Sequence, residues 1–179
     1  MKKLLSFCMG MLLAVPALYA QKGNNQLKLL AETGLPGRQD KIGWGVQVKG
    51  AYGAGRAAQL TLMTGLSRFS SREGHVQTVT RLVPVLVGYK KNVGRVYVEP
   101  QAGYGELGGK VDLGGDFARP SVGAFFWAVG GGYDHGRLDV GVRYQSAHEA
   151  EGAAAGIWRN KAFHFTGLHI GYNLFAPKK

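Results

Sequence analysis

Apolar and polar residues alternate with a period of two along most of this chain. The segment RLDVGVRYQ, Arg137–Gln145, shows it most clearly, because every second residue from Leu138 to Tyr144 is apolar and the residues between are polar or glycine. This period predicts a β-strand with one apolar and one polar face. In a soluble protein the apolar face would point inward, whereas in a membrane barrel it would point outward into lipid.

Eight segments with this alternation are separated by turn-forming residues. They are Gln26–Thr33, Gly43–Tyr52, Ala58–Phe69, Thr78–Tyr89, Arg95–Tyr104, Val122–Tyr133, Arg137–Gln145 and Phe163–Phe175. The links between them alternate in length: 53–57, 90–94 and 134–136 are short, and 34–42, 70–77, 105–121 and 146–162 are long. Outer-membrane barrels have short periplasmic turns and longer external loops. The sequence therefore predicts an all-β, eight-stranded, antiparallel up-and-down transmembrane β-barrel.

Aromatic residues at the strand ends indicate where the membrane surfaces lie, since barrels carry a girdle of such rings at each interface. The expected short-turn girdle comprises Tyr52, Tyr89, Tyr133 and either Tyr172 or Phe175. The expected long-loop girdle comprises Trp44, Phe69, Tyr104, Tyr144 and Phe163. Pro84 and Pro100 fall inside strands, where a missing N–H breaks the ladder, so we expect a bulge or gap where their two strands meet.

The first twenty residues have the pattern of a secretory signal peptide. Lys2 and Lys3 precede an apolar run, and the small residue Ala20 suggests cleavage before Gln21. We therefore divide the chain into a cleaved signal peptide, 1–20, and one barrel domain, 21–179. Cys8, the single cysteine, would leave with the signal, so no disulfide is expected.

The chain is basic, with 22 Lys and Arg against 11 Asp and Glu, and loss of Lys2 and Lys3 would leave a net charge of +9. A basic surface indicates an anionic partner. Nucleic acid is not expected for an exported chain, which favours outer-membrane lipid and the phosphates of lipopolysaccharide.

Three stretches resemble the small outer-membrane β-barrel domain proteins of Gram-negative bacteria, the group that includes OmpX-like and PorT-like barrels. They are RLVPVLVGYKKNVGRVYVEPQAGYG, SVGAFFWAVGGGYDHGRLDVGVRYQ and FHFTGLHIGYNLF. The resemblance implies location in the bacterial outer membrane and insertion by the barrel-assembly machinery, which reads a C-terminal strand. The residues that match such a signal are Gly167, Ile170, Tyr172 and Phe175, although Ala176–Lys179 follow and Phe175 is out of register with Leu174.

Charged residues on the polar faces are expected to meet inside the barrel. They are Glu32, Lys49, Glu99, Asp139 and Arg143. Eight strands leave an interior just wide enough for side chains, so this charge network should plug the lumen. A narrow ion path is the alternative.

The stretch GVRYQSAHEAEG invites comparison with the outer-membrane lipid A 3-O-deacylases, whose strand of this type ends in His-x-Ser. Aligned this way, Gln145 and Ala147 take the positions of the histidine and the serine, and neither can act as base or nucleophile. Ser146, His148 and Glu149 are nearby, but adjacent strand residues point to opposite faces. His164 and Thr166 resemble an interfacial polar pair more than a hydrolase site. We expect no catalytic residue, no metal site and no cofactor.

Basic residues gather in the predicted external loops and could pair with lipopolysaccharide phosphates. The candidates are Arg38, Lys41, Arg68, Arg72, Arg119, Arg159 and Lys161. The sequence thus favours a monomeric, non-enzymatic outer-membrane barrel with a structural or surface-interaction role. A lipid-modifying enzyme and a soluble, lipocalin-like ligand-binding barrel remain the alternatives.

Overall fold

One antiparallel sheet makes up the protein in the structure, a computed structural model that describes residues 25–37, 42–55, 57–73, 76–112, 117–118, 121–149 and 162–175. The strands are β1 (Gln26–Pro36), β2 (Gly43–Gly55), β3 (Ala58–Glu73), β4 (Val76–Val93), β5 (Val96–Asp112), β6 (Phe117–Ala118), β7 (Ser121–His135), β8 (Leu138–Glu149) and β9 (Phe163–Asn173). The signal-peptide prediction falls outside the described residues. Among those residues, no helix has the length and apolar character needed to span a membrane.

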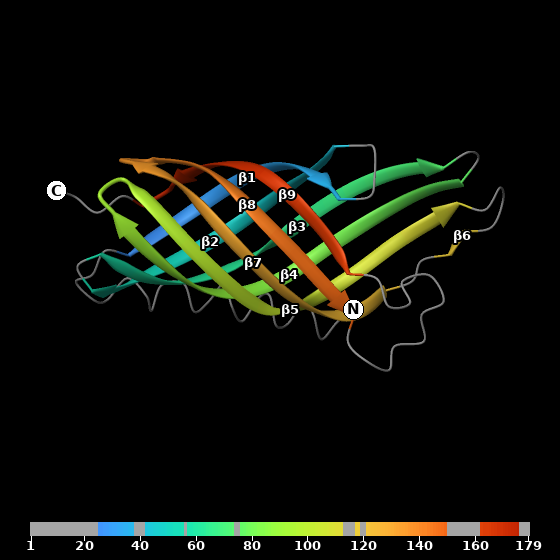
Figure 1. The fold of residues 1–179 in the computed structure, drawn as a ribbon, viewed down its shortest axis with the longest axis horizontal. Coiled ribbons are helices and arrows are strands. Elements are labelled where there is room, and N and C mark those ends of the chain that lie inside the picture. Colours follow the sequence, from blue (N-terminus) through green and yellow to red (C-terminus); the bar gives the residue numbers. More distant parts are fainter. Residues whose placement is uncertain are drawn as a thin grey trace.

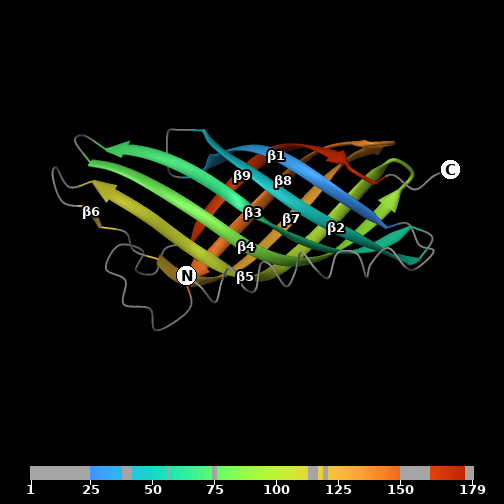
Figure 2. The same ribbon diagram turned by 180° about the vertical axis from the view of Figure 1, so that it is seen from behind.

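Pairing of the first long strand with the last closes the sheet into a barrel. β1 pairs with β2 on one side and with β9 on the other, and β4 pairs with β5, so each of the eight long strands has two neighbours. In Figures 1 and 2 these strands run obliquely around the barrel, with β1 beside β9. Following paired residues around the sheet from Gln26 returns to Pro36, a stagger of ten residues that produces this tilt.

The apolar face of the wall points outward, and the predicted eight-stranded barrel is confirmed. Val140 and Val142 of β8 are 51% and 50% exposed, whereas Asp139 between Leu138 and Val140 is fully buried. The same outward apolar face is found on the other long strands; examples are Leu29, Val48, Leu60, Val87, Val98, Val129 and Ile170. An apolar outer surface of this extent is unsuited to water, which argues against the soluble lipocalin-like alternative.

Glycine permits the tightest turns at the short end of the barrel. Gly94 between β4 and β5, and Gly136 between β7 and β8, both have φ of 64°. Two-residue hairpin loops favour this left-handed conformation, which side chains with a Cβ rarely adopt. The short turns predicted at these positions are therefore present.

The strands are longer than predicted at the opposite end. The segment 70–77 was expected to be a loop, but β3 extends to Glu73 and β4 begins at Val76. Likewise β5 extends through 105–112. Polar residues such as Ser70 and Thr78 blur the alternation here, because the strands rise beyond the apolar band.

Two aromatic residues expected in the long-loop girdle lie inside the barrel instead. Phe69 is 1% exposed and Phe163 is 8% exposed. Phe69 shares the inward face of β3 with Thr61 and Ser67, so the period of two places it inside. Trp44 and Tyr104 do lie on the outer wall, at 55% and 67% exposure.

Both prolines coincide with interruptions of the ladder. Between β4 and β5 the pairing passes from Gly88↔Gln101 directly to Lys91↔Val98, which leaves Pro100 in a gap. The interruption at Pro84 lies between β3 and β4, whereas we expected it between β4 and β5, where Pro84 pairs with Gly105. Each gap thus lies on the side of the strand to which the backbone N–H that proline lacks would have donated.

Candidate functional site

The interior of the short-turn half of the barrel holds a connected network of charged and polar side chains. All eight long strands contribute to it. Its charged and aromatic members are Lys28 and Glu32 (β1), Lys49 (β2), Lys90 (β4), Tyr97 and Glu99 (β5), Asp134 (β7), Asp139 and Arg143 (β8) and His169 (β9), and β3 adds Thr61 and Met63.

Asp139 is the most heavily paired carboxylate of this interior charge network. Lys28 Nζ lies 2.8 Å from its Oδ2, and the Tyr97 hydroxyl donates to its Oδ1 at 2.6 Å. The Tyr97 oxygen is also 3.0 Å from His169 Nε2, which itself lies 3.5 Å from Asp139 Oδ1. Four strands, β1, β5, β8 and β9, therefore meet at one buried carboxylate.

Asp134 completes this cluster at the barrel mouth. It accepts from Lys28 Nζ at 2.6 Å and from Lys90 Nζ at 2.7 Å, and its side chain is 16% exposed. Lys90 also lies 3.9 Å above the centroid of the Tyr97 ring, within range of a cation–π contact. Two lysines and two aspartates thus close the end of the lumen next to the short turns.

A second ion pair crosses the middle of the barrel. Lys49 Nζ lies 2.9 Å from Glu99 Oε2, and both side chains are 4% exposed. The other carboxylate oxygen, Oε1, accepts hydrogen bonds from Thr61 at 2.7 Å and from Gln101 at 2.8 Å. Glu99 therefore has its charge balanced and both oxygens satisfied, as a buried carboxylate requires.

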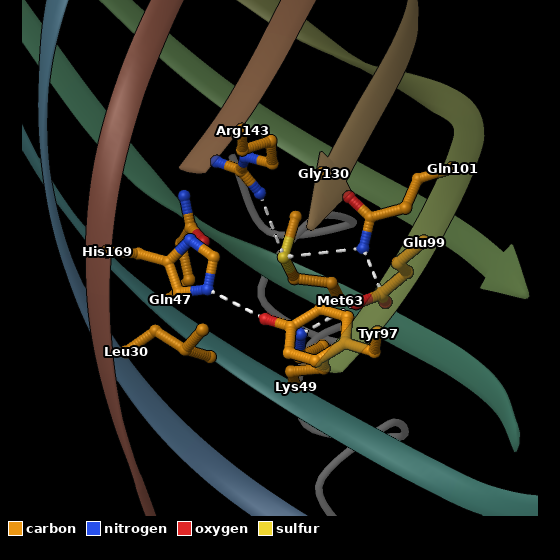
Figure 3. A pocket seen from close by; sticks show the side chains of 10 residues that line it. All are labelled: Leu30, Gln47, Lys49, Met63, Tyr97, Glu99, Gln101, Gly130, Arg143 and His169. Carbon is orange, nitrogen blue, oxygen red and sulfur yellow. Dashed lines mark hydrogen bonds and ion pairs between the residues drawn. The ribbon is translucent and has the colours of Figure 1, made fainter. Parts of the chain in front are cut away.

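The third ion pair, Arg143–Glu32, lies next to the Lys49–Glu99 pair. Figure 3 shows the side chains around Arg143. Arg143 NH2 donates to Glu32 Oε2 at 2.6 Å, and the Gln47 amide donates to the same oxygen at 2.7 Å. Arg143 NH1 also points at the Met63 sulfur, at 3.0 Å, with Gln101 on the sulfur's other side. A cavity of about 10 Å³ lies among these side chains, near the lower limit for one water molecule.

Charge is balanced within the interior charge network. The cations Lys28, Lys49, Lys90 and Arg143 face the anions Glu32, Glu99, Asp134 and Asp139. Burying a charge costs several kcal/mol unless it is paired and hydrogen-bonded, and here each one is paired. Gly141 makes room for the packing, since a Cβ there would lie 2.7 Å from the His169 ring.

The long-loop half of the interior is mainly apolar, with Ser67, Thr80 and Gln145 as buried polar exceptions, and the sequence did not predict this cluster. Its buried cluster comprises Met63, Phe69, Leu82, Leu86, Leu107, Val122, Ala124, Phe126, Ala128, Ala147, Phe163 and Phe165. The Phe69 ring packs 4.8 Å from that of Phe165 and 5.2 Å from that of Phe163. The described interior is thus filled by ion pairs at one level and by aromatic and aliphatic side chains at the next.

The structure brings the five predicted interior residues into three separate ion pairs and adds partners to them. Glu32 pairs with Arg143, Lys49 pairs with Glu99, and Asp139 pairs with Lys28. Sequence reasoning missed Lys90 and Asp134, which looked like turn residues. It also missed Tyr97, although this residue shares the strand face of Glu99 two positions later.

Few of the predicted external cations can be placed. Arg68 is an exposed residue of β3, and Arg72 belongs to the same strand, but its side chain is not described. Arg38, Lys41, Arg119, Arg159 and Lys161 fall outside the described residues. Of the predicted assembly signal, Gly167, Ile170 and Tyr172 lie in β9, whereas Phe175 follows the end of that strand and is 50% exposed.

Ser146 and His148 are closer in space than we expected. They lie two positions apart, at positions of β8 whose period matches the outward residues, although Ser146 itself is only 3% exposed; Ser146 Oγ lies 3.1 Å from His148 Nε2. We expected strand geometry to separate the candidate residues, because adjacent residues point to opposite faces. That expectation was wrong for Ser146 and His148, which are two positions apart and therefore lie on the same face. Trp127 Nε1 also donates to His148 Nε2, at 3.3 Å.

The described wall around this pair is aromatic and holds no Lys, Arg, Asp or Glu. His164 of β9 is the register partner of Ser146, and its ring stacks on Tyr144 at 6.2 Å between centroids. Among the side chains that the structure describes, no group of three or more His, Cys, Asp or Glu is arranged to hold a metal ion.

Comparison with known proteins shows the class to which this fold belongs. The chain resembles Ail, the attachment invasion locus protein of Yersinia pestis, with a TM-score of 0.63 and 12% identity over 86% of this chain and 99% of Ail. It resembles the N-terminal β-barrel domain of Pseudomonas aeruginosa OprF (TM-score 0.59, 12% identity, 85% and 99% coverage). The outer membrane enzyme PagL matches at a TM-score of 0.52, with 15% identity over 81% of this chain and 98% of PagL.

The fold is that of the small eight-stranded outer-membrane β-barrels. No protein-family model matches the sequence, and no curated protein matches it. Because one of these structural neighbours is an enzyme and another is an attachment protein, the shared fold leaves the activity to be argued from the side chains.

Loss of Arg143 is expected to weaken the barrel. Arg143→Ala leaves the buried Glu32 carboxylate without its cation, a change that costs about 3–5 kcal/mol when a buried pair is broken. The variant should shift from its folded to its unfolded gel mobility at a lower temperature than the parent. Arg137→Ala, at an exposed arginine of the short-turn end, is the control and should leave this temperature nearly unchanged. Equal heat resistance of Arg143→Ala and parent would show that this pair does not support the fold.

Proposed function

We propose that this protein is a non-enzymatic, non-conducting barrel of the bacterial outer membrane whose long-loop end contacts an anionic surface. The observation that carries the proposal is the filled interior: a charge-balanced network at the short-turn end, followed by a packed apolar cluster. Ions would have to break ion pairs at one level and cross packed phenylalanines at the next. The barrel therefore supports a wall and surface role better than a transport role.

A conductance measurement tests the closed lumen. In a planar lipid bilayer, the purified protein should add no stepwise current above that of the bilayer and detergent alone. The number of strands supports this expectation, because the lumen of an eight-stranded barrel is just wide enough for the barrel's own side chains. Regular, voltage-stable openings from the folded protein would refute the closed-lumen proposal.

The anionic partner is supported by charge and by a structural neighbour. The sequence has an excess of 11 positive charges, or 9 after loss of Lys2 and Lys3 with the signal peptide, and the segments between strands at the long-loop end hold five basic residues (Arg38, Lys41, Arg119, Arg159 and Lys161) against three acidic ones (Asp40, Asp116 and Glu151). Ail has been crystallised with the heparin analogue sucrose octasulfate, a polyanion. We assign lipopolysaccharide phosphate as the partner, because it is the abundant anion at the outer surface of this membrane.

Lipopolysaccharide binding should depend on salt. The detergent-solubilised protein is expected to bind purified lipopolysaccharide at low salt and to release much of it at high salt, because exposed charges are screened. The measurement is co-sedimentation or surface capture at both ionic strengths. Binding that is absent, or that is indifferent to salt, would contradict an electrostatic partner.

We extend the proposal to insertion and assembly. The proposal includes cleavage of the signal peptide near Ala20 and delivery to the barrel-assembly machinery through β9, with Gly167, Ile170, Tyr172 and Phe175 as the recognised residues. A monomer is favoured because β1 pairs with β9 and closes the sheet, so the described long strands leave no edge open for a second copy.

A second candidate function is favoured by one observation, the Ser146–His148 hydrogen bond on the outer wall. A serine hydroxyl within hydrogen-bond reach of a histidine nitrogen is the minimal arrangement for nucleophilic attack on an ester. The competing Trp127 N–H at the same nitrogen weakens this candidate, because it occupies the acceptor that a base would need. Release of labelled acyl chains from lipid A by the parent, lost in Ser146→Ala and retained in Ser121→Ala, would favour the enzyme; no release would exclude it.

A further inference from the structure

Two arginines stand directly opposite each other on the outer wall at the long-loop end. Arg68 of β3 is the register partner of Arg81 of β4, and both are exposed. Like charges opposite each other on one face of a sheet repel and destabilise the pairing of strands. Such a pair is tolerated more readily if an anion lies between the two guanidinium groups.

One carboxylate offsets only half of this charge. Glu106 of β5 accepts a hydrogen bond from Arg81 NH2 at 2.7 Å. Among the described side chains, none forms an ion pair or a hydrogen bond with Arg68. The two arginines and Glu106 therefore carry a net charge of about +1 at this place.

The pair marks the boundary of the apolar wall. Below Arg68 on the same outward face of β3 lie Leu66, Leu62 and Leu60, which are 39%, 41% and 50% exposed. Trp44 of β2 is the register partner of Arg68 on its other side and is 55% exposed. Tryptophan is enriched where hydrocarbon meets headgroups, so the guanidinium groups lie at headgroup depth.

We propose that Arg68 and Arg81 together bind the phosphate of an anionic lipid in the leaflet at the long-loop end, with the lipid's acyl chains lying along β2–β4. The inference rests on the membrane role proposed above and narrows its anionic partner to one phosphate at one place. Guanidinium groups bind phosphate oxygens bidentately. A lipid fits better than free phosphate because the wall below the arginines is largely apolar, with Thr64 as the polar residue on this face of β3.

The arrangement is confined to one side of the barrel. At the same end, none of the described outward side chains of β7–β9 is an arginine or a lysine. At the short-turn end, Arg137 donates to the Tyr172 hydroxyl at 2.9 Å. Arg137 is thus an outer-wall arginine with a protein partner, and it serves as the matched control.

Trp44 provides a local probe of lipid composition beside Arg68. In a Trp127→Phe, Trp158→Phe background, the protein is reconstituted in phosphatidylcholine vesicles that contain a small fraction of either brominated phosphatidylglycerol or brominated phosphatidylcholine. An arginine near a membrane surface favours an anionic lipid about fivefold. Brominated phosphatidylglycerol should therefore quench Trp44 well beyond brominated phosphatidylcholine at equal mole fraction.

The variants decide the assignment. The excess quenching should disappear in Arg68→Gln/Arg81→Gln, persist in Arg137→Gln, and resist millimolar inorganic phosphate; retained gel mobility shows that each variant is folded. Equal quenching by both lipids, excess quenching that survives the double substitution, or competition by free phosphate would each overturn the proposal. Salt-dependent binding of lipopolysaccharide together with equal quenching would refute this site while leaving the proposed function intact.

Discussion

Asp139→Ala is expected to lower the free energy of unfolding by about 3–5 kcal/mol, the cost of breaking a buried ion pair from one side. The substitution removes one of the two carboxylates that pair with Lys28 and the carboxylate that accepts from the Tyr97 hydroxyl, and both side chains stay buried. Urea unfolding of the protein in phosphatidylcholine vesicles, followed by tryptophan fluorescence, measures the loss.

Two further variants separate charge from hydrogen bonding at this position. Asp139→Asn keeps an oxygen for Tyr97 but loses the charge opposite Lys28, so it should recover part of the stability. Asp134→Ala removes a carboxylate that also contacts Lys28 but is partly exposed, and water can replace it, so the expected loss is smaller. An Asp139→Ala protein within about 1 kcal/mol of the parent would contradict the bracing role of the network.

Phe165→Ala is expected to cost about 3–5 kcal/mol, as truncation of a buried phenylalanine does elsewhere. Phe165 is 1% exposed and packs against Phe69 inside the long-loop half of the barrel. A cavity there cannot collapse easily, because the surrounding wall is a closed hydrogen-bonded sheet. The same urea titration measures the effect.

The matched control for this substitution lies on the outer wall. Phe125→Ala removes an aromatic ring that is 38% exposed and contacts Tyr104 edge-on. In lipid, acyl chains can fill the space that the ring leaves, so the loss should be clearly smaller than for Phe165→Ala. Equal losses for the two variants would mean that the apolar cluster adds nothing beyond ordinary wall packing.

The strands were predictable because a membrane imposes the alternation that the sequence shows. Between the two membrane interfaces, each side chain faces either the lipid or the lumen. The alternation of apolar with polar or glycine residues is therefore strict from Leu138 to Tyr144. Beyond the membrane this constraint weakens, and the extension of β3 to Glu73 was read as loop. The inward position of Phe69 was predictable in principle from its face, but its place near a strand end suggested a girdle.

It was harder to predict which charged residues pair inside the barrel than to predict which residues lie there. Glu32 and Arg143 are 111 positions apart in the chain, and their contact depends on the stagger with which β1 and β8 enter the sheet. Lys90 and Asp134 lie near turns, where a charged residue normally meets water, although the period of two places both on the inward faces of β4 and β7. The Ser146–His148 contact was also not predicted, because it depends on side-chain positions along one face of β8.

The orientation of the wall is tested most directly at two neighbouring positions of β7. Ala128 is 2% exposed and Val129 is 44% exposed, so one points into the lumen and the other away from it. In a Cys8→Ser background, each is replaced by cysteine and spin-labelled, and relaxation by lipid-soluble oxygen is compared with relaxation by a water-soluble nickel chelate in vesicles. The account predicts a Val129→Cys label that is relaxed by oxygen and shielded from nickel, and an Ala128→Cys site that is shielded from both or resists labelling. A Val129→Cys label that nickel relaxes more than oxygen would contradict it.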